Sequence, residues 1–315
     1  MDAMKKVLVV GAGTMGNSLA FLYARGGHEV KLVDKNPQAL ERAVKLIKST
    51  AGTMLKAGVV TEQEAKEIPT RVQAGDSIEG YGKDIDLAVE TVDEDPPTKK
   101  LIFSLLDAYC PEHAIFTSNT SALNIFEIID VKRPERVAIT HFFAPPHIIP
   151  LVEVVPHRDM SGEVVQMILK LLESLGKTTL LLKEYIPGFI VNRIQRAIAR
   201  ESFSLVDRGI VSVEEMDKAV KASLGIRLPV VGVMQTYDFT GLDTTTKIGK
   251  ETPIDLAPAA GPSRTISEKL AKGEFGVKTG KGLYDYSGRT MEEVLETRDL
   301  NYLRILRAIE QTEKL

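Results

Sequence analysis

The chain has 315 residues, of which 43% are hydrophobic and 26% are charged, a balance typical of a folded globular protein and a length sufficient for two domains. Its 40 Lys and Arg nearly cancel its 43 Asp and Glu, and the formal net charge of -3 predicts neither nucleic-acid binding nor attraction to an anionic membrane. The single cysteine, Cys110, excludes an intrachain disulfide and favours a reducing compartment, so we expect a cytoplasmic protein.

The first elements alternate between strand and helix. Residues 6–10 are a short β-branched run, typical of a strand buried in a parallel sheet. Residues 18–25 indicate a helix that ends at Gly26, and a second strand over 29–33 stops at Asp34. Because the first strand starts so near the N-terminus, and because no apolar run is long enough to span a membrane, we expect neither a signal peptide nor a transmembrane segment.

A helical hairpin is predicted next. Asn36 and Pro37 suit the N-cap and the first position of a long helix that continues to about Lys56. Gly58 ends this helix, and residues 61–64 form a capping box that opens another one.

The rest of the chain divides into a strand-rich and a helical part. Strands are predicted over 85–89, 114–117, 137–140, 151–155 and 178–182, and helices over 162–175, 190–208, 213–222, 262–272 and 291–315. Residues 228–234 fit either type. The pattern predicts an α/β fold, namely a doubly wound Rossmann-type parallel sheet followed by a smaller all-α domain. With the boundary near the Pro187-Gly188 turn, the pattern predicts a sheet domain with an inserted helical hairpin over residues 1–184 and a smaller helical domain over residues 185–315.

The motif G-x-G-x-x-G lies between the first strand and the first helix. Gly11 permits the tight turn, Gly13 lets the backbone approach a pyrophosphate, and Gly16 allows close packing of helix on strand. Thr14 and Met15 lie within this loop and are candidate cofactor contacts, and the N-terminus of the helix that follows attracts phosphate. This context predicts a dinucleotide site.

Asp34 selects the cofactor. It ends the second strand, where an acid that binds the ribose hydroxyls belongs. Its charge repels a 2′-phosphate, although Lys35 offsets part of this repulsion. We therefore expect NAD rather than NADP.

Polar segments follow the later strands at the carboxyl edge of the sheet, where a Rossmann fold places its active site. A base must take the proton when a secondary alcohol is oxidised, and histidine suits this because it titrates near neutral pH. His141 is the candidate base, and Glu153 on the next strand can orient its ring. Ser121 and Asn192 can donate hydrogen bonds to the substrate or the nicotinamide. The histidines lack metal-ligand spacing, so we expect no metal site.

These motifs together resemble the 3-hydroxyacyl-CoA dehydrogenase family over essentially the whole chain. The matching segments are G-A-G-T-M-G, E-T-V-D-E-D, S-N-T-S, H-F-F, P-L-V-E-V-V, P-G-F-I-V-N-R, G-L-D and K-T-G-K-G. The resemblance implies that His141 is the base, that Glu153 is its partner, and that Ser121 and Asn192 bind substrate.

The same resemblance implies further contacts and partners. Glu94, Lys99 and Lys278 would contact the cofactor, NAD. The substrate would lie between the domains, and the helical domain would form a homodimer. The implied reaction is oxidation of (S)-3-hydroxyacyl-CoA to 3-oxoacyl-CoA, in fatty acid metabolism.

The chain departs from the family pattern at a few positions. Ala144 stands where the family has Asn. In the long helix, Thr50 replaces a coenzyme A-binding Ser, and Ala57 replaces a Lys, although Lys56 is adjacent. Arg227 in the helical domain could instead bind a free carboxylate. A dehydrogenase of a non-CoA hydroxy acid or a pyridine-carboxylate-type alcohol is therefore an alternative, and a non-catalytic, crystallin-like protein is another.

Overall fold

The computed structural model describes residues 4–251, 254–258, 261 and 263–312. The chain divides into two units, Met1–Asn192 (unit 1) and Arg193–Leu315 (unit 2). No helix among the described residues is both long enough and apolar enough to cross a membrane.

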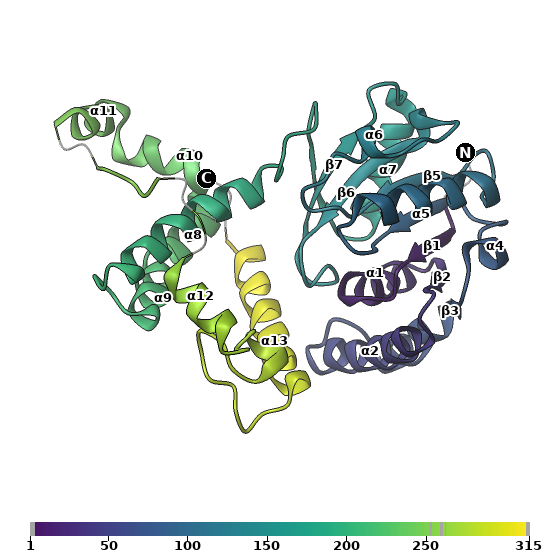
Figure 1. Ribbon diagram of the computed structural model, residues 1–315, viewed down its shortest axis with the longest axis horizontal. Coiled ribbons are helices and arrows are strands. Elements are labelled where there is room, and N and C mark those ends of the chain that lie inside the picture. The colour runs from purple at the N-terminus through teal and green to yellow at the C-terminus, as the bar shows by residue number, and fades with distance from the viewer. Residues whose placement is uncertain (1–3, 252–253, 259–260, 262, 313–315) are drawn as a thin grey trace. The chain divides into compact units, whose positions relative to one another are not determined.

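In the described part of unit 1, eight strands form one sheet (Figure 1). The strands are β1 (Lys6–Val10), β2 (Glu29–Val33), β3 (Val72–Gly75), β4 (Leu87–Glu90), β5 (Ile115–Ser118), β6 (Val137–Phe142), β7 (Leu151–Pro156) and β8 (Thr178–Leu181). Their order is β3-β2-β1-β4-β5-β6-β7-β8, and all neighbours are parallel except β6 and β7. The chain direction across the sheet reverses between β1 and β4, which creates the switch point where open α/β sheets bind ligands.

Helices cover both faces of this sheet. They are α1 (Thr14–Arg25), α2 (Pro37–Lys56), α3 (Glu62–Glu67), α4 (Ile78–Tyr81), α5 (Pro96–Tyr109), α6 (Ile125–Ile128) and α7 (Gly162–Ser174), with the 3₁₀ helices η1 (Ile68–Arg71) and η2 (Pro134–Arg136). Right-handed crossovers from β1 to β2 and from β4 to β5 run in opposite directions, so α1 and α5 lie on opposite faces. The hairpin prediction is confirmed, since Asn36 caps α2 and Thr61 forms the capping box of α3.

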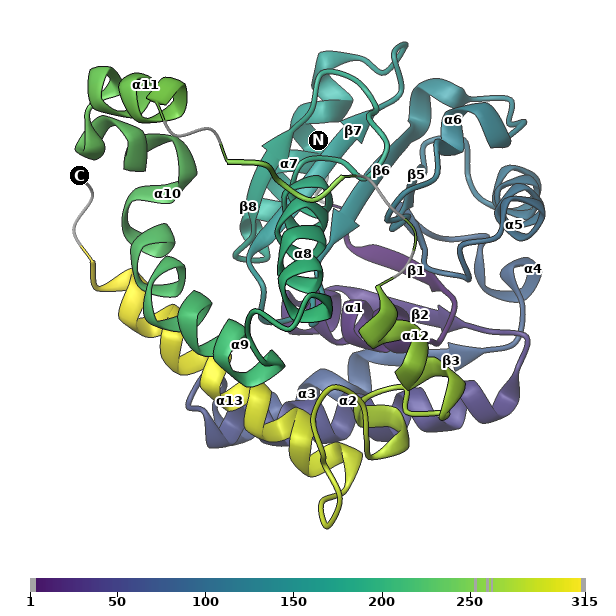
Figure 2. The same cartoon turned by 60° about the vertical axis from the view of Figure 1, so that its left-hand side comes forward.

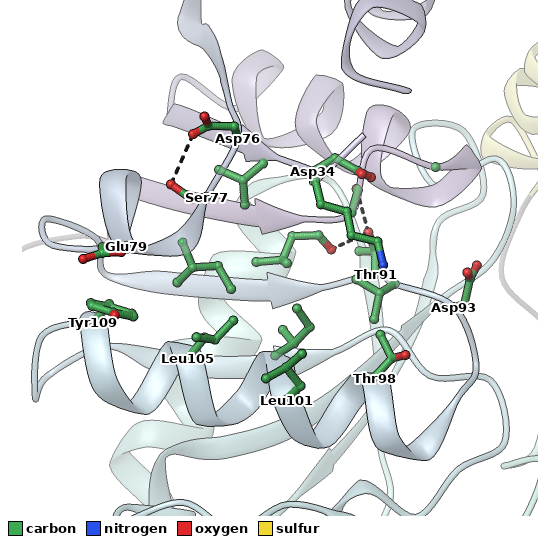
Figure 3. A pocket seen from close by; sticks show the side chains of 18 residues that line it. Asp34, Asp76, Ser77, Glu79, Thr91, Asp93, Thr98, Leu101, Leu105 and Tyr109 are labelled. Carbon is green, nitrogen blue, oxygen red and sulfur yellow. Dashed lines mark hydrogen bonds between the residues drawn. The ribbon is translucent and has the colours of Figure 1, made fainter. Parts of the chain in front are cut away.

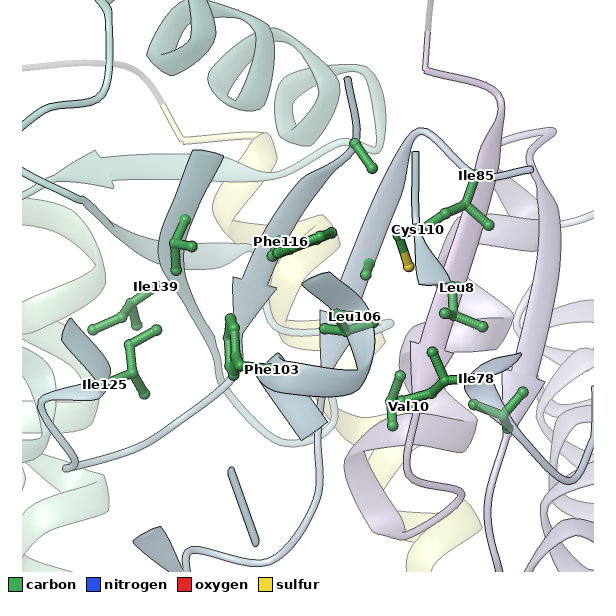
Figure 4. Packing of buried hydrophobic residues seen from close by; sticks show 14 of the residues in the cluster. Leu8, Val10, Ile78, Ile85, Phe103, Leu106, Cys110, Phe116, Ile125 and Ile139 are labelled. Carbon is green, nitrogen blue, oxygen red and sulfur yellow. The ribbon is translucent and has the colours of Figure 1, made fainter. Parts of the chain in front are cut away.

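The core on one face of the sheet joins the strands to α4, α5 and α6 (Figure 4). Its buried side chains include Leu8, Phe116 and Ile139 from the strands and Ile78, Phe103 and Ile125 from the helices. The central strands β1, β4, β5 and β6 are buried from both sides, which is why they read as mainly apolar runs in the sequence.

The sequence prediction of the sheet was wrong in two respects. It missed β3, a short strand with two exposed residues that lacks a β-branched run. It also expected parallel strands throughout, whereas β7 runs antiparallel to β6. Residues 143–150 join these two strands without the helix that a parallel crossover requires.

Unit 2 is helical in its described residues. Its helices are α8 (Val191–Asp207), which begins at the end of unit 1, α9 (Val213–Ala222), α10 (Leu224–Thr240), α11 (Leu242–Glu251), α12 (Arg264–Ala271), η3 (Val277–Thr279) and α13 (Met291–Glu310). The ambiguous residues 228–234 lie inside α10, which leads from α9 to α11 (Figure 2). Pro229 and the kink at Gly232 (φ +66°) explain why the segment did not read as a regular helix. Pro262 and residues 313–315, predicted as helix ends, lie outside the described residues.

Candidate active site

The loop after β1 is built around its glycines. Gly11 has a φ of +103°, and a Cβ there would lie 3.0 Å from the Thr91 backbone. A Cβ on Gly16 would lie 1.7 Å from the Gly11 carbonyl oxygen, so only glycine lets the first turn of α1 pack this closely. A Cβ on Gly13 would meet no described atom within 4 Å, so the backbone there is open to a ligand. No described side chain caps α1 at Thr14, which leaves its N–H groups for a phosphate.

A cavity of about 470 Å³ opens beside this loop, at the ends of β1, β2 and β4 and along α5 (Figure 3). Asp34 lines it, and its two oxygens accept hydrogen bonds from the backbone N–H groups of Ala12 (2.7 Å) and Asn36 (2.8 Å). The other charged residues described in the lining are Lys35, Asp76, Glu79 and Asp93. Four carboxylates against one ammonium oppose an additional phosphate in this cavity.

A buried ion network follows β4. Glu90 ends this strand, and its fully buried carboxylate accepts hydrogen bonds from the Lys99 ammonium (2.8 Å) and the Ser118 hydroxyl (2.5 Å). Lys99, only 1% exposed, also lies 3.1 Å from the Glu94 carboxylate. Burial raises the pKa of Glu90, against the opposing charge of Lys99. Neither Glu94 nor Lys99 is among the described residues that line the cavity. Sequence reasoning missed Glu90, which reads simply as the polar end of an apolar strand.

Glu94 holds the segment that follows β5. One of its oxygens accepts hydrogen bonds from the Thr120 hydroxyl (2.6 Å) and from the backbone N–H groups of Ser121 (2.7 Å) and Ala122 (3.0 Å). Burial acts to raise the pKa of Glu94, but these hydrogen bonds and Lys99 together hold it below its ordinary value. The carboxylate is therefore an anion that fixes the backbone around Ser121.

The same segment is held from a second side by residues near the end of unit 1. The Tyr185 hydroxyl donates to the Ala122 carbonyl (2.5 Å), and the Asn192 amide donates to the Ser121 carbonyl (3.3 Å). Ser121 itself is exposed, and no described residue is recorded as a hydrogen-bond partner of its hydroxyl. Its backbone is thus fixed while its side chain remains available.

His141 and Glu153 face each other across β6 and β7. They are directly paired in the antiparallel register, so both side chains lie on the same face of the sheet. The Nδ1 atom of His141 lies 2.8 Å from Glu153 Oε2, and the two side chains are 4% and 0% exposed. Glu153 Oε1 accepts hydrogen bonds from the backbone N–H groups of Ile190 (2.9 Å) and Val191 (3.0 Å), at the start of α8. Burial acts to raise the pKa of Glu153, but the hydrogen bonds from His141 and this backbone hold it below its ordinary value.

Two aromatic rings pack against the His141 imidazole. The Phe143 ring centre lies 4.5 Å away with the planes at 60°, and the Phe189 ring centre lies 5.1 Å away with the planes at 36°. Because Glu153 occupies Nδ1, the Nε2 atom is the ring nitrogen left to exchange a proton with a ligand. The sequence prediction that His141 and Glu153 pair is confirmed by this geometry.

Comparison with known proteins decides the family. Residues 6–185 match the sequence model described as 3-hydroxyacyl-CoA dehydrogenase, NAD binding domain, and residues 188–286 match the C-terminal domain of the same family. The chain belongs to the 3-hydroxyacyl-CoA dehydrogenase family. The predicted fold class, the predicted family and NAD as cofactor are confirmed, and the protein is an NAD-dependent oxidoreductase of this family.

Relatives in the family carry different substrate names. The 5-formyl-3-hydroxy-2-methylpyridine 4-carboxylate 5-dehydrogenase of Mesorhizobium japonicum is 30% identical over 98% of this chain and 100% of its own length. The probable 3-hydroxybutyryl-CoA dehydrogenase of Bacillus subtilis is 33% identical over 91% of this chain and 99% of its own length. A crystal structure of an NAD+-dependent 5-formyl-3-hydroxy-2-methylpyridine 4-carboxylic acid 5-dehydrogenase matches with a TM-score of 0.87 at 28% identity, over 98% of this chain and 100% of that chain.

The remaining family positions belong to other elements of the two units. Thr50 and the exposed Lys56 lie on α2 of unit 1. Arg227 and Lys278 belong to unit 2, where Arg227 donates to the Ser223 hydroxyl (3.1 Å) and the Lys278 ammonium lies 5.3 Å from the centre of the Phe275 ring. Among the residues that the structure describes, no cluster of three or more His, Cys, Asp or Glu could hold a metal ion.

Proposed function

We propose that His141 is the general base of an NAD-dependent alcohol oxidation. The observation that carries this proposal is the buried pair of His141 Nδ1 and Glu153, 2.8 Å apart, with Nε2 left to act on a substrate. The anionic Glu153 orients the imidazole and stabilises the imidazolium that forms when Nε2 takes the hydroxyl proton. NAD, when bound, accepts the hydride from the carbon that carries this hydroxyl.

The polar residues around the base have proposed binding roles. The Ser121 hydroxyl and the Asn192 amide donate hydrogen bonds to the substrate oxygen, since the Ser121 backbone is already fixed by Glu94 and Tyr185. Glu94 would hold this segment in place next to the cofactor, and Lys99 would hold the Glu94 carboxylate.

The cofactor itself would lie along the glycine loop. Gly11, Gly13 and Gly16 would shape the pyrophosphate site, with the first N–H groups of α1, at Thr14 and Met15, facing the phosphates. Asp34 would accept the ribose hydroxyls in the adjoining cavity. Lys278 is proposed as a further cofactor contact on the basis of family resemblance.

We propose a small hydroxy acid with a free carboxylate as the substrate class. The pyridine-carboxylate relative aligns with this chain from end to end, and Arg227 offers a guanidinium that suits a carboxylate. Ala57 also removes the lysine with which the family contacts coenzyme A, and Ala144 changes the loop beside His141.

The second candidate is (S)-3-hydroxyacyl-CoA, oxidised to 3-oxoacyl-CoA in fatty acid metabolism. It is favoured by both family models and by the 3-hydroxybutyryl-CoA relatives. Thr50 and the exposed Lys56 on α2 would then contact the coenzyme A.

A substrate panel tests these proposals. The purified chain is mixed with NAD and either 3-hydroxybutyryl-CoA, 3-hydroxybutyrate or hydroxymethyl-pyridine carboxylates, and NADH absorbance is followed. We expect the highest kcat/KM with a free acid. Arg227→Ala should reduce kcat/KM more for the free acids than for the thioesters. A higher kcat/KM with thioesters selects the second candidate. His141→Ala should lower kcat roughly 10²–10⁴-fold. Absence of NADH formation from every substrate would instead favour a non-catalytic, crystallin-like protein.

We also propose a homodimer formed through unit 2, with a boundary between the functional domains near residue 184. Several apolar side chains of α10 and α11 are exposed, including Ile226, Met234, Phe239 and Leu242. A second copy of the chain would remove such a surface from water. A monomer in light scattering at micromolar concentration would contradict this proposal. We also propose that the protein works in a reducing, cytoplasmic compartment, because Cys110 is the single cysteine of the sequence.

A further inference from the structure

Phe189 adopts an unusual backbone conformation in a buried place. Its φ is +47°, in the left-handed region that bulky side chains rarely adopt, and its side chain is fully buried. Among the described residues other than glycine, Phe189 is the one with a positive φ. Such strain persists only where surrounding contacts enforce it, and it concentrates at functional sites.

The contacts that enforce this conformation come from the His141 pair. Glu153 Oε1 accepts hydrogen bonds from the two N–H groups that directly follow Phe189, those of Ile190 and Val191. Before it, the Phe189 N–H donates to the Ile186 carbonyl (2.9 Å). The backbone on both sides of Phe189 is therefore fixed, and one of the anchors is the carboxylate that orients the candidate base.

The Phe189 ring joins two parts of the candidate site. It packs against the His141 imidazole, with 5.1 Å between the two ring centres. Glu153 contacts the same imidazole at its edge, at Nδ1. It also contacts the Tyr185 ring at 5.8 Å with perpendicular planes. Tyr185 in turn holds the Ala122 carbonyl beside Ser121.

We infer that Phe189 is a positioning residue for the reaction: its ring holds the plane of the His141 imidazole so that Nδ1 stays on Glu153 and Nε2 is directed to the substrate. The inference rests on the proposed role of His141 as base. Through Tyr185, the same ring aligns His141 with the Ser121 segment. A change that loosens the imidazole should lower kcat, because proton transfer requires close alignment, and should leave cofactor binding at the glycine loop unaffected.

A role in core packing alone is the competing explanation, and the chain offers a matched control for it. Phe103 on α5, labelled in Figure 4, is also fully buried. It belongs to the same core cluster as Phe189. Its ring makes no recorded contact with the rings of the described histidines. Phe189→Leu and Phe103→Leu both remove a buried aromatic ring, but only the first removes one from His141.

The experiment compares kcat, KM and the Kd for NADH in the full-length chain and these two variants, with the best substrate of the panel. We expect Phe189→Leu to lower kcat roughly 10–100-fold, with the Kd for NADH within about 3-fold of the wild-type value. The pH profile of kcat should also change, because the packing around the imidazole changes. Phe103→Leu should lose a similar amount of thermal stability and retain its kcat and its pH profile.

Three results would overturn the inference. If Phe189→Leu keeps its kcat, or if Phe103→Leu loses as much, Phe189 acts only in packing. If Phe189→Leu does not fold, Phe189→Met replaces it, because methionine fills irregular volumes. If neither folds while Phe103→Leu does, Phe189 is required for folding and not for alignment. His141→Ala separates this test from the proposed function: an active His141→Ala enzyme refutes the base itself, whatever Phe189 does.

Discussion

Replacing Lys177 with methionine should alter how the stability of unit 1 depends on pH. Lys177 lies between α7 and β8 and is 6% exposed. Its ammonium donates to the carbonyl oxygens of Pro146 (2.5 Å) and Ile149 (3.0 Å), both in the loop that joins β6 to β7. Burial and the nearby charge of Arg25 lower the pKa of Lys177 from 10.5 to about 7.

The magnitude follows from this depressed pKa. Between about pH 7 and about pH 10.5 the unfolded chain keeps a proton on Lys177 that the folded chain releases, so folding becomes more favourable as pH rises and less favourable as it falls. One pKa unit corresponds to about 1.4 kcal/mol. Because the folded group is half-titrated near pH 7, its contribution to the free energy of unfolding increases by about 2 kcal/mol between about pH 7 and about pH 9. Methionine does not titrate and lacks this increase.

Urea denaturation of the wild type and of Lys177→Met at these two pH values measures the effect. The two orphaned carbonyls cost stability at both values, so the informative quantity is the change in the difference between the two proteins. This difference should grow by about 2 kcal/mol toward the higher pH. Lys170→Met, which replaces an exposed lysine on α7, should show no such growth. A difference that stays constant would refute the depressed pKa of Lys177.

Two further predictions concern acidic side chains. Asp34→Ala should narrow the preference for NAD over NADP by roughly 10–100-fold, because it removes a few kcal/mol of repulsion of the 2′-phosphate. NAD should remain preferred, because Asp76, Glu79 and Asp93 also line the cavity. The ratio of kcat/KM for the two cofactors measures the preference, and an unchanged ratio would place the ribose elsewhere. Asp207 at the end of α8 accepts hydrogen bonds from the start of α12, led by the Thr265 hydroxyl, and these lower its pKa to about 2. Its contribution to stability is present above about pH 4 and is lost as pH falls through about 2. Asp207→Ala should therefore lower the Tm of unit 2 much more at pH 6 than at pH 2. Equal losses of Tm at both pH values would contradict this linkage.

Local signals in the sequence predicted much of the fold and of the candidate site. The glycine loop, Asp34 and the caps at Asn36 and Thr61 depend on residues a few positions apart, and each was found where expected. The strand pattern alone does not give the direction of β7, because it reads the same in a parallel and an antiparallel partner. The signal for the antiparallel direction is the short connection 143–150, which contains no helix.

Long-range contacts account for the site residues that sequence reasoning did not find. Glu90 is part of a buried hydrogen-bond network because its carboxylate accepts from Lys99 on the next helix and from Ser118 on the next strand. Phe189 lies in a motif that was recognised, but its contact with His141 spans 48 positions and requires a backbone conformation that its residue type disfavours. Periodicity and composition contain no information about such contacts.

The antiparallel register of β6 and β7 constrains the two strands more strictly than the turn that joins them. Slipping either strand by a single residue would send His141 and Glu153 to opposite faces of the sheet, so no intermediate register would retain the pair. The turn between the strands is under no such constraint, and it can exchange side chains, as at Ala144, while the hydrogen-bonded ladder stays intact. Under the proposed mechanism, a substitution in this turn would therefore leave the His141–Glu153 pair in register.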